Sequence, residues 1–376
     1  MTTTAEVPAV NGATEKGAKK RPITPPLLFK PTHPIKVQPK DALPSPVLEA
    51  RSKRLKINAS QLGGDPSEWL GKSILSVEQF SLEALELVFR HGDEMRELVA
   101  KRGGDTRLRG RILGTLFFEN STRTCCSFQA AMARLGGVVM AVNESTSSVK
   151  KGETLEDTVV TLQTYCDVLS IRHPQKGAVT RAVGIGVKPI LNAGDGIGEH
   201  PTQALLDMYT IHCELGGIEG KVVTMLGDLK HGRTVHSLAK LLALYKCEIH
   251  YVSPESLAMP PHITEYVSSK GMVTGQHNHN HYNEILSKTD VLYVTRIQKE
   301  RFPEEAEYEA VRGCFCVTPE VLAKAKKDMI LMHPLPRVGE ISEACDEDPR
   351  AAYFRQMENG MLVRMGLLSL ICPHGA

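Results

Sequence analysis

Four consecutive residues, Ser121, Thr122, Arg123 and Thr124, combine chemical groups that suit phosphate binding. The preceding stretch, 111–118, is apolar and β-prone, as expected for a strand buried on both faces of a parallel sheet. Ser121 or Thr122 can cap the helix that follows, whose first N–H groups lack internal partners and form the positive end of its dipole. Arg123 adds a planar fork of donors. The local pattern fits phosphate binding and an ordinary capped helix about equally.

Further polar segments follow predicted strands, and each offers side chains that could meet a ligand. They are 145–154, 172–174, 194–203, 227–234, 295–301 and 333–337. A solvated basic loop explains 145–154 just as well, and a lone histidine such as His200 is usually structural. Three glycines precede His200, however, and let the backbone approach a ligand. Because ligands of parallel α/β sheets bind beyond the carboxyl ends of the strands, these segments predict one site.

Four arginines stand at these strand ends, and their charge indicates the substrate. They are Arg123, Arg172, Arg233 and Arg296, with Lys151 in a neighbouring loop. Such a site suits substrates with several negative charges. The sequence has no Ser-His-Asp order, no GxSxG turn and no paired-carboxylate pattern, which argues against covalent or two-acid hydrolysis. Electrostatic polarisation of a carbonyl next to a phosphate fits better.

Two other readings of the motifs are weak. The 227–234 loop has the position of a dinucleotide loop but lacks GxGxxG. The run His277-Asn278-His279-Asn280-His281 suggests a metal site, but alternating spacing on an extended loop does not converge ligands, and acidic or cysteine partners are missing nearby. We predict a polar loop there, and neither a cofactor nor a metal for the protein.

Composition indicates a globular protein of two domains. The chain has 376 residues, 41% hydrophobic and 23% charged, and a formal charge of +2. Residues 1–56 carry eleven Lys and Arg against four Asp and Glu, which leaves the remainder mildly acidic and predicts neither a nucleic-acid surface nor a membrane span. Nine scattered cysteines without a CxxC pair predict reduced thiols in the cytoplasm.

The first 66 residues contrast with the rest. They are rich in Pro and Lys and lack periodicity, so we predict a disordered linker there, with a transit peptide as the less favoured alternative. From Ser73 helices and strands alternate, which predicts an α/β fold of two doubly wound parallel-sheet domains. Helices are predicted over 81–99, 124–135, 154–165, 200–215, 234–245 and 353–370, and strands over 114–118, 137–142, 168–171, 187–192, 221–226, 248–252, 291–294 and 329–333.

The motifs together resemble the carbamoyltransferases. The segments 121–124, 150–154, 172–174 and 200–203 carry the general resemblance, and 227–237, 295–301 and 333–337 narrow it to the aspartate carbamoyltransferase family. The likeness is collinear from about Gly71 to Leu370 and closest to the eukaryotic form in the multifunctional pyrimidine-synthesis polypeptide. It implies a carbamoyl-phosphate domain over 67–212, completed by a terminal helix at 350–376, and an aspartate domain over 213–349.

The resemblance also implies a reaction and roles. The family transfers the carbamoyl group of carbamoyl phosphate to L-aspartate in pyrimidine (UMP) biosynthesis. Carbamoyl phosphate would lie on 121–124, with Thr124, Arg172 and His200 on its carbonyl oxygen. Gln203 and the Leu335 carbonyl would contact the carbamoyl amine, and Arg233, Arg296 and Gln298 would bind aspartate. Ser147 and Lys151 would come from the neighbouring subunit of a homotrimer, and Lys151 would also reach aspartate.

Two alternatives are less favoured. Ornithine carbamoyltransferases resemble this chain but have a His-Cys-Leu-Pro motif at the last strand, where this sequence has Pro334. Arg233 and Arg296 also suit a dicarboxylate. An inactive scaffold domain would not need every motif position filled, as it is here. The family resemblance further implies that other domains of a multifunctional polypeptide are possible partners.

Overall fold

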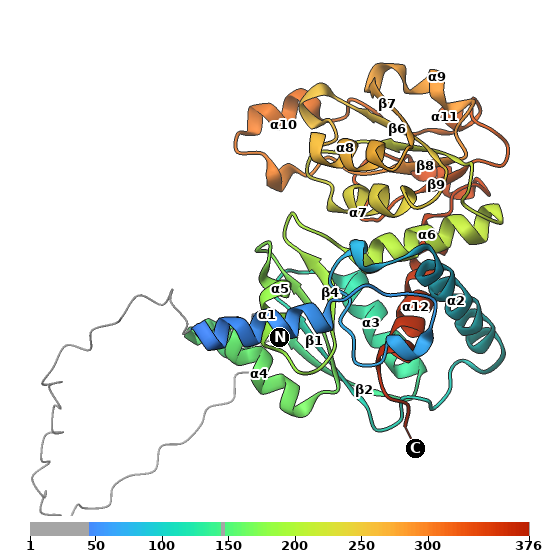
Figure 1. Cartoon of the computed structure of the whole chain (residues 1–376). Coiled ribbons are helices and arrows are strands. Elements are labelled where there is room, and N and C mark those ends of the chain that lie inside the picture. Colours follow the sequence, from blue (N-terminus) through green and yellow to red (C-terminus); the bar gives the residue numbers. More distant parts are fainter. Residues whose placement is uncertain (1–44, 144–146, 376) are drawn as a thin grey trace, which may run out of the picture. The chain divides into compact units, whose positions relative to one another are not determined.

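The structure, a computed structural model, describes residues 45–143 and 147–375. Two parallel sheets organise these residues (Figure 1). The prediction of two parallel-sheet α/β halves is confirmed. The part of the predicted linker at 1–44 lies outside the described residues.

The first sheet has four strands in the order β2-β1-β3-β4, all parallel. Its strands are β1 (Ile112–Phe117), β2 (Val138–Asn143), β3 (Val168–His173) and β4 (Ile190–Asp195). The helices of this half are α2 (Leu82–Arg102), α3 (Thr122–Arg134), α4 (Leu155–Tyr165), α5 (Ala178–Ile185) and α6 (Pro201–Leu215). β1 is almost entirely buried, as its apolar sequence requires, whereas β2 is an edge strand with Val138 exposed.

The second sheet has five parallel strands in the order β7-β6-β5-β8-β9. Its strands are β5 (Val222–Leu226), β6 (Glu248–Ser253), β7 (Val273–Asn278), β8 (Val291–Val294) and β9 (Ile330–Met332). Its helices are α7 (Arg233–Leu242), α8 (Pro261–Ser269), α9 (Tyr282–Leu286), α10 (Glu305–Val311) and α11 (Pro319–Leu322). In both sheets the first strand of the series, β1 or β5, lies inside the sheet, so crossovers run to either side of it.

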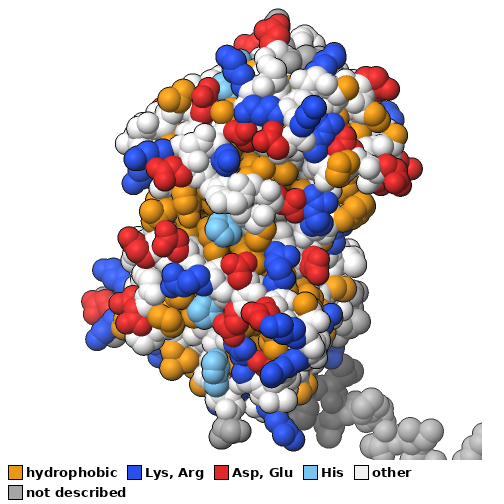
Figure 2. Space-filling model, turned by 90° about the vertical axis from the view of Figure 1, so that its right-hand side faces the viewer, with side chains coloured by type: hydrophobic (Ala, Val, Ile, Leu, Met, Phe, Trp, Pro, Cys, Tyr) orange, Lys and Arg blue, Asp and Glu red, His pale blue; other side chains and the backbone are white. Residues whose placement is uncertain are grey.

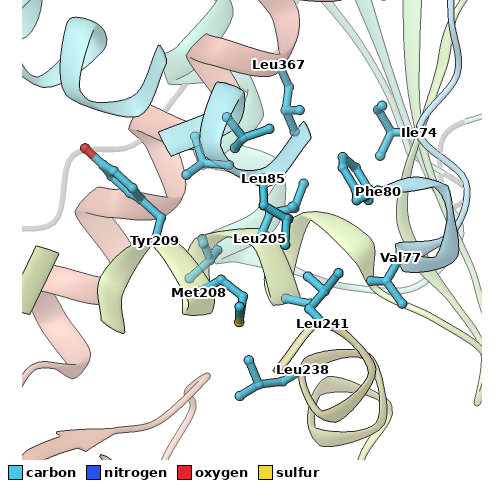
Figure 3. Close-up of a cluster of buried hydrophobic side chains, with 14 of the residues drawn as sticks. Ile74, Val77, Phe80, Leu85, Leu205, Met208, Tyr209, Leu238, Leu241 and Leu367 are labelled. Carbon is cyan, nitrogen blue, oxygen red and sulfur yellow. The ribbon is translucent and has the colours of Figure 1, made fainter. Parts of the chain in front are cut away.

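Helices α6 and α12 (Tyr353–Ile371) join the two halves. α6 packs against β4 of the first sheet and against α7 of the second, and α12 packs on α2, α3, α6 and β9. Figure 3 shows Leu205 and Met208 of α6 beside Leu238 and Leu241 of α7. Leu205, Met208 and Leu238 are completely buried. A continuous hydrophobic core therefore holds the carboxyl ends of both sheets in one arrangement.

Several elements differ from the sequence-based expectations. Residues 45–58 of the predicted linker form the helix α1 (Ser45–Asn58), whose Leu55 packs beside the core and whose Arg54 donates to the Ile185 carbonyl at 3.1 Å. The linker prediction is therefore wrong for this part. The polar-loop prediction is wrong at His277 and Asn278, which end the edge strand β7. The sequence analysis also did not predict the helices α5, α8, α9, α10 and α11. The helices and strands that it did predict exist within a few residues of their expected bounds.

Candidate functional site

The carboxyl ends of both sheets border one cavity of about 540 Å³. The residues that line it follow β1, β3, β4, β5, β8 and β9, as expected for ligand sites of parallel sheets. They include Glu119, Ser121, Thr122, Arg123, Thr124, Arg172, His200, Gln203, Arg233, Thr234, Arg296, Gln298, Glu300, His333, Leu335 and Arg364. The polar segments singled out in the sequence thus meet at one place.

Three helices begin at this cavity. α3 begins after Ser121, α6 after His200, and α7 at Arg233, and all three residues are among the lining. Neither Ser121 nor His200 uses its side chain as a helix cap, so the capping expected of Ser121 is not observed. The unpaired N–H groups and positive dipole ends of three helices therefore favour an anionic ligand.

Five arginines add charge to the same cavity: Arg123, Arg172, Arg233, Arg296 and Arg364. Burial, reinforced by the neighbouring Arg233, lowers the pKa of Arg172 to about 10. Burial likewise lowers the pKa of Arg364 to about 10, and that of Arg233 moves in the same direction for the same reason. Desolvated like charges at this density are costly, and an anion between them relieves the cost.

Two carboxylates of the chain itself partly compensate these arginines. Glu119 Oε2 lies 3.1 Å from Arg172 Nη2 and 3.4 Å from Arg233 Nη2. Arg296 forms a two-bond ion pair with Glu300, one turn further along. Glu119 follows β1 of the first sheet, whereas Arg233 begins α7, which belongs to the second. The Glu119 carboxylate therefore links the two halves of the fold. These ion pairs within the protein therefore orient the side chains of Arg172, Arg233 and Arg296.

Three buried nitrogens at the cavity have no hydrogen-bond partner among the described residues: Arg172 Nε, His200 Nδ1 and Arg364 Nε. Burial, together with Arg233, Arg172 and Arg364, holds the pKa of His200 well below its usual range. The imidazole is therefore neutral near pH 7 and can donate one hydrogen bond without adding charge. Buried polar groups normally find partners, so these nitrogens indicate where a polar ligand binds.

The segment after β9 supplies backbone to the site. Leu335 has a left-handed φ of 55°, unusual for a non-glycine residue, and the Leu335–Pro336 peptide bond is cis. The Leu335 amide donates to His333 Nδ1 at 2.7 Å, and His333 Nε2 pairs with Glu340 Oε1 at the same distance. The conformation of this proline-rich segment is therefore fixed by its own side chains.

A glycine brings the end of β4 against the arginines. Gly194 has a φ of 124°, in the region that side chains avoid. A Cβ atom at this position would lie 3.0 Å from Arg172 Nη1 and 3.2 Å from Arg233 Nη2. The expectation that the glycines before His200 permit a close approach therefore has a physical basis here.

Two residues predicted for the site are elsewhere. Ser147 precedes, and Lys151 ends, the short 3-10 helix Ser148–Lys151, and neither lines the cavity of this chain. The other predicted site residues do line it: Ser121, Thr122, Arg123, Thr124, Arg172, His200, Gln203, Arg233, Arg296, Gln298 and Leu335. Three further lining residues, Glu119, Glu300 and Arg364, were not predicted from the motifs. The FFEN order around Glu119 could have signalled the first, but Arg364 lies in an unremarkable helical stretch.

The cavity suits a small ligand that has several negative charges and a carbonyl. Positive helix ends and arginines favour anionic groups, while Thr124, His200 and Arg172 add further hydrogen-bond donors to the lining. The charge is local to the cavity. The face shown in Figure 2 carries Lys or Arg and Asp or Glu side chains intermingled. Among residues 45–143 and 147–375, no cluster of three or more possible metal ligands occurs, and no helix is long and apolar enough to cross a membrane.

Comparisons with known proteins agree with this chemistry. Residues 72–213 match the family described as aspartate/ornithine carbamoyltransferase, carbamoyl-P binding domain, and residues 219–371 match its Asp/Orn binding domain. The multifunctional protein pyr1-3 of Dictyostelium discoideum is 56% identical over 81% of this chain, and the multifunctional protein CAD of Squalus acanthias is 53% identical over 81%. The chain spans only 14% and 13% of the length of these two relatives.

Shorter relatives are matched over their whole length. The aspartate carbamoyltransferase catalytic subunit of Methanopyrus kandleri is 49% identical over 82% of this chain and 100% of its own. A crystal structure of aspartate transcarbamoylase from Trypanosoma cruzi with carbamoyl phosphate has a TM-score of 0.78 and 44% identity, covering 81% of this chain and 97% of its own. With both halves matched and a relative covered completely, this chain belongs to the aspartate/ornithine carbamoyltransferase family.

Proposed function

We propose that this chain transfers the carbamoyl group of carbamoyl phosphate to the amino group of L-aspartate. The products are N-carbamoyl-L-aspartate and phosphate, which places the reaction in pyrimidine biosynthesis. The observation that carries the proposal is the convergence of three helix N-termini, five arginines and the buried His200 on one cavity. Relatives named aspartate carbamoyltransferase, and structures of one with both carbamoyl phosphate and aspartate, support the same reaction.

Carbamoyl phosphate binds at the start of α3 in this proposal. Its phosphate lies against the N–H groups, the hydroxyls of Ser121, Thr122 and Thr124, and the Arg123 guanidinium. Burial and the nearby Arg296 lower the pKa of Arg123, so an anion beside it recovers lost electrostatic stabilisation. Charge-assisted hydrogen bonds of this kind are roughly twice as strong as neutral ones.

The reaction requires stabilisation of charge on the carbamoyl oxygen. The amino nitrogen of aspartate attacks the carbamoyl carbon, the C–O bond to phosphate breaks, and the nitrogen loses a proton, for which the departing phosphate is the acceptor. Thr124, Arg172 and neutral His200 donate to the oxygen as its negative charge grows. Removal of one such donor typically costs about 100- to 1000-fold in rate. A protein nucleophile is not required.

Aspartate binds through its two carboxylates in this proposal. Arg233 and Arg296 provide two guanidinium forks for them, with Gln298 beside the second. Arg296 pairs with the Glu300 carboxylate through two bonds, and Arg233 Nη2 lies 3.4 Å from Glu119 Oε2, which supports carboxylates as partners of both arginines. The amine of ornithine would gain nothing from a second arginine.

We further propose a homotrimer whose subunits share sites. Ser147 and Lys151 lie outside the cavity of their own chain, next to the exposed edge strand β2, which supports their action in a neighbouring subunit. There Lys151 would reach aspartate and the reacting group. All nine cysteines are unpaired, which supports the cytoplasm as compartment. Other domains of a multifunctional polypeptide are possible partners.

We also propose domain bounds of 67–212, completed by 350–376, and 213–349. Packing of α12 on α2 and α3 supports the assignment of the terminal helix to the first domain. Because α1 packs against α5 and Leu62 is buried in the core, residues 45–66 would join this first domain.

A direct assay tests the proposed reaction. Purified protein is incubated with carbamoyl phosphate and L-aspartate, and both N-carbamoyl-L-aspartate and released phosphate are measured. We expect one phosphate for each product molecule, and loss of both signals in Arg172→Ala. Phosphate release without carbamoyl-aspartate would instead show hydrolysis and reject the proposal.

A further inference from the structure

One carboxylate is buried beneath the cavity without lining it. Asp207 on α6 is completely inaccessible to solvent, and its two oxygens receive three hydrogen bonds. Gln203 Nε2 and Gln356 Nε2 donate to Oδ1 at 2.9 and 2.7 Å, and the Tyr293 hydroxyl donates to Oδ2 at 2.8 Å. All three donors are neutral. The cation Arg364 acts on Asp207 only through its electric field and lowers its pKa slightly.

The three donors come from different parts of the fold. Gln203 stands one turn earlier on α6, Gln356 belongs to α12, and Tyr293 belongs to β8 of the second sheet. Burying a carboxylate is costly, and burial accordingly raises the pKa of Asp207 to about 7. An apolar residue would fill this space at a lower cost in free energy. We therefore infer that the carboxylate is needed as an acceptor of hydrogen bonds.

The first consequence concerns the orientation of Gln203. An amide has a donor end and an acceptor end, and nothing in its shape distinguishes them. Asp207 Oδ1 accepts from Gln356 Nε2, and in the same way it accepts from the Nε2 end of Gln203. The Oε1 end is left for the cavity that Gln203 lines. An acceptor in that position can bind an amine but repels a second carbonyl oxygen.

The second consequence reaches the segment after β9. Gln356 gives its Nε2 to Asp207, which leaves its Oε1 to accept from the His333 amide at 3.0 Å. His333 Nδ1 then accepts from the Leu335 amide. This chain of hydrogen bonds fixes the backbone from His333 to Leu335, a residue that lines the cavity and whose carbonyl is an acceptor.

We propose that Asp207 is the positioning residue that makes the site specific for an amide-bearing acyl phosphate. It turns the acceptor of Gln203 and the carbonyl of Leu335 toward the NH₂ group of the substrate, and so selects carbamoyl phosphate over acyl phosphates that carry a methyl group. This inference rests on the proposed function, because it assumes that carbamoyl phosphate occupies the cavity. Sites built to hydrogen-bond a polar group reject analogues without it strongly.

Acetyl phosphate provides the probe, since it keeps the phosphate and the carbonyl and replaces NH₂ with CH₃. The dissociation constants of carbamoyl phosphate, acetyl phosphate and inorganic phosphate are measured by competition for wild type and Asp207→Ala. In Asp207→Ala the amide of Gln203 is free to turn, so we expect the preference for carbamoyl over acetyl phosphate to fall by about tenfold or more. The affinity for inorganic phosphate should change less than about threefold.

Two further variants, Asp207→Asn and Gln356→Met, test the role of Asp207 if Asp207→Ala folds poorly. Asp207→Asn retains an acceptor for both glutamines and should keep most of the preference, whereas Gln356→Met disconnects Leu335 and should lose part of it. Thr210→Val is the matched control. It removes a buried α6–α12 hydrogen bond, from Asn359 Nδ2 at 3.0 Å, without touching the chain of bonds, and should leave the preference unchanged.

Two results would overturn the role of Asp207. One is an equal loss of affinity for all three ligands in Asp207→Ala, which would indicate general structural damage. The other is an unchanged preference in Asp207→Ala and Gln356→Met. Failure of wild type to bind carbamoyl phosphate would instead contradict the proposed function itself, and the two failures are therefore distinguishable.

Discussion

Glu119 Oε2 and Arg172 Nη2 lie 3.1 Å apart, in an ion pair that lines the cavity. The same oxygen reaches Arg233, so one carboxylate compensates two desolvated guanidinium groups. Burial and the charge of Arg233 lower the pKa of Arg172, burial lowers the pKa of Arg233, and Glu119 offsets part of both shifts. The pair therefore stabilises a site that is electrostatically costly on its own.

Glu119→Gln should destabilise the fold and make it depend on anions. Loss of the carboxylate leaves Arg172 and Arg233 uncompensated, so we expect the free energy of unfolding to fall by about 1–3 kcal/mol. Inorganic phosphate should restore more stability in this variant than in wild type, because it replaces the missing charge. Thermal unfolding with and without phosphate measures both. Glu97→Gln, which removes an exposed helix pair with Lys101, is the control and should change neither quantity.

Arg296→Ala should weaken aspartate binding while sparing carbamoyl phosphate. The guanidinium of Arg296 holds a carboxylate through two bonds in the structure, and loss of such a contact costs about 3 kcal/mol, or more than 100-fold in KM for aspartate. Initial rates at varied aspartate and a binding titration with carbamoyl phosphate separate the two effects. Arg312→Ala, which removes an exposed pair with Glu309, controls for charge. Unchanged aspartate kinetics would remove Arg296 from the site.

Mixing two inactive variants tests the shared sites. If Lys151 acts in the neighbouring subunit, a mixture of Lys151→Ala and Arg123→Ala protein can rebuild intact sites from complementary chains. After dissociation and reassembly at equal amounts, the two chains combine at random in the ring. A site is intact only if its own chain keeps Arg123 and the neighbouring chain keeps Lys151, so about a quarter of wild-type activity is expected. Each variant alone, treated identically, should stay inactive. A mixture that gains nothing would show that each chain uses its own Lys151.

His200 should remain neutral through the physiological pH range and make stability pH-dependent. The pKa of the folded state lies well below the value near 6.5 of the unfolded state. Below pH about 6.5 the unfolded chain therefore binds a proton that the folded chain does not, and stability falls by up to about 1.4 kcal/mol per pH unit. Denaturant unfolding between pH 5 and 7.5 should show less of this loss in His200→Gln than in wild type. Equal slopes in both proteins would show that His200 titrates normally.

The sequence predicted the site best where polar side chains stand at the ends of predicted strands. Ser121 to Thr124 and Arg172 follow apolar strands, and the rule that parallel strands end at one edge was enough to group them. The burial of β1, with only Ile112 partly accessible, follows from its largely apolar sequence, in which Thr115 is the one polar side chain.

Elements without a periodic apolar face could not be predicted. α1 has polar residues all around and is held by Leu55, Arg54 and its packing on α5, contacts to residues over a hundred positions away. β7 is a polar edge strand, so its sequence resembles a loop. The bonds of Asp207 to Tyr293 and Gln356 also join residues 86 and 149 positions apart, and such long-range pairing has no local signature.

A competition between two amino acids in one tube tests the proposed transfer to aspartate most directly. Purified protein receives ¹³C-labelled carbamoyl phosphate with equal amounts of L-aspartate and L-ornithine, and the labelled products are identified by NMR. We expect N-carbamoyl-L-aspartate almost alone, because Arg233 and Arg296 suit two carboxylates. Formation of citrulline as the main product, or of neither product while carbamoyl phosphate remains intact, would contradict it.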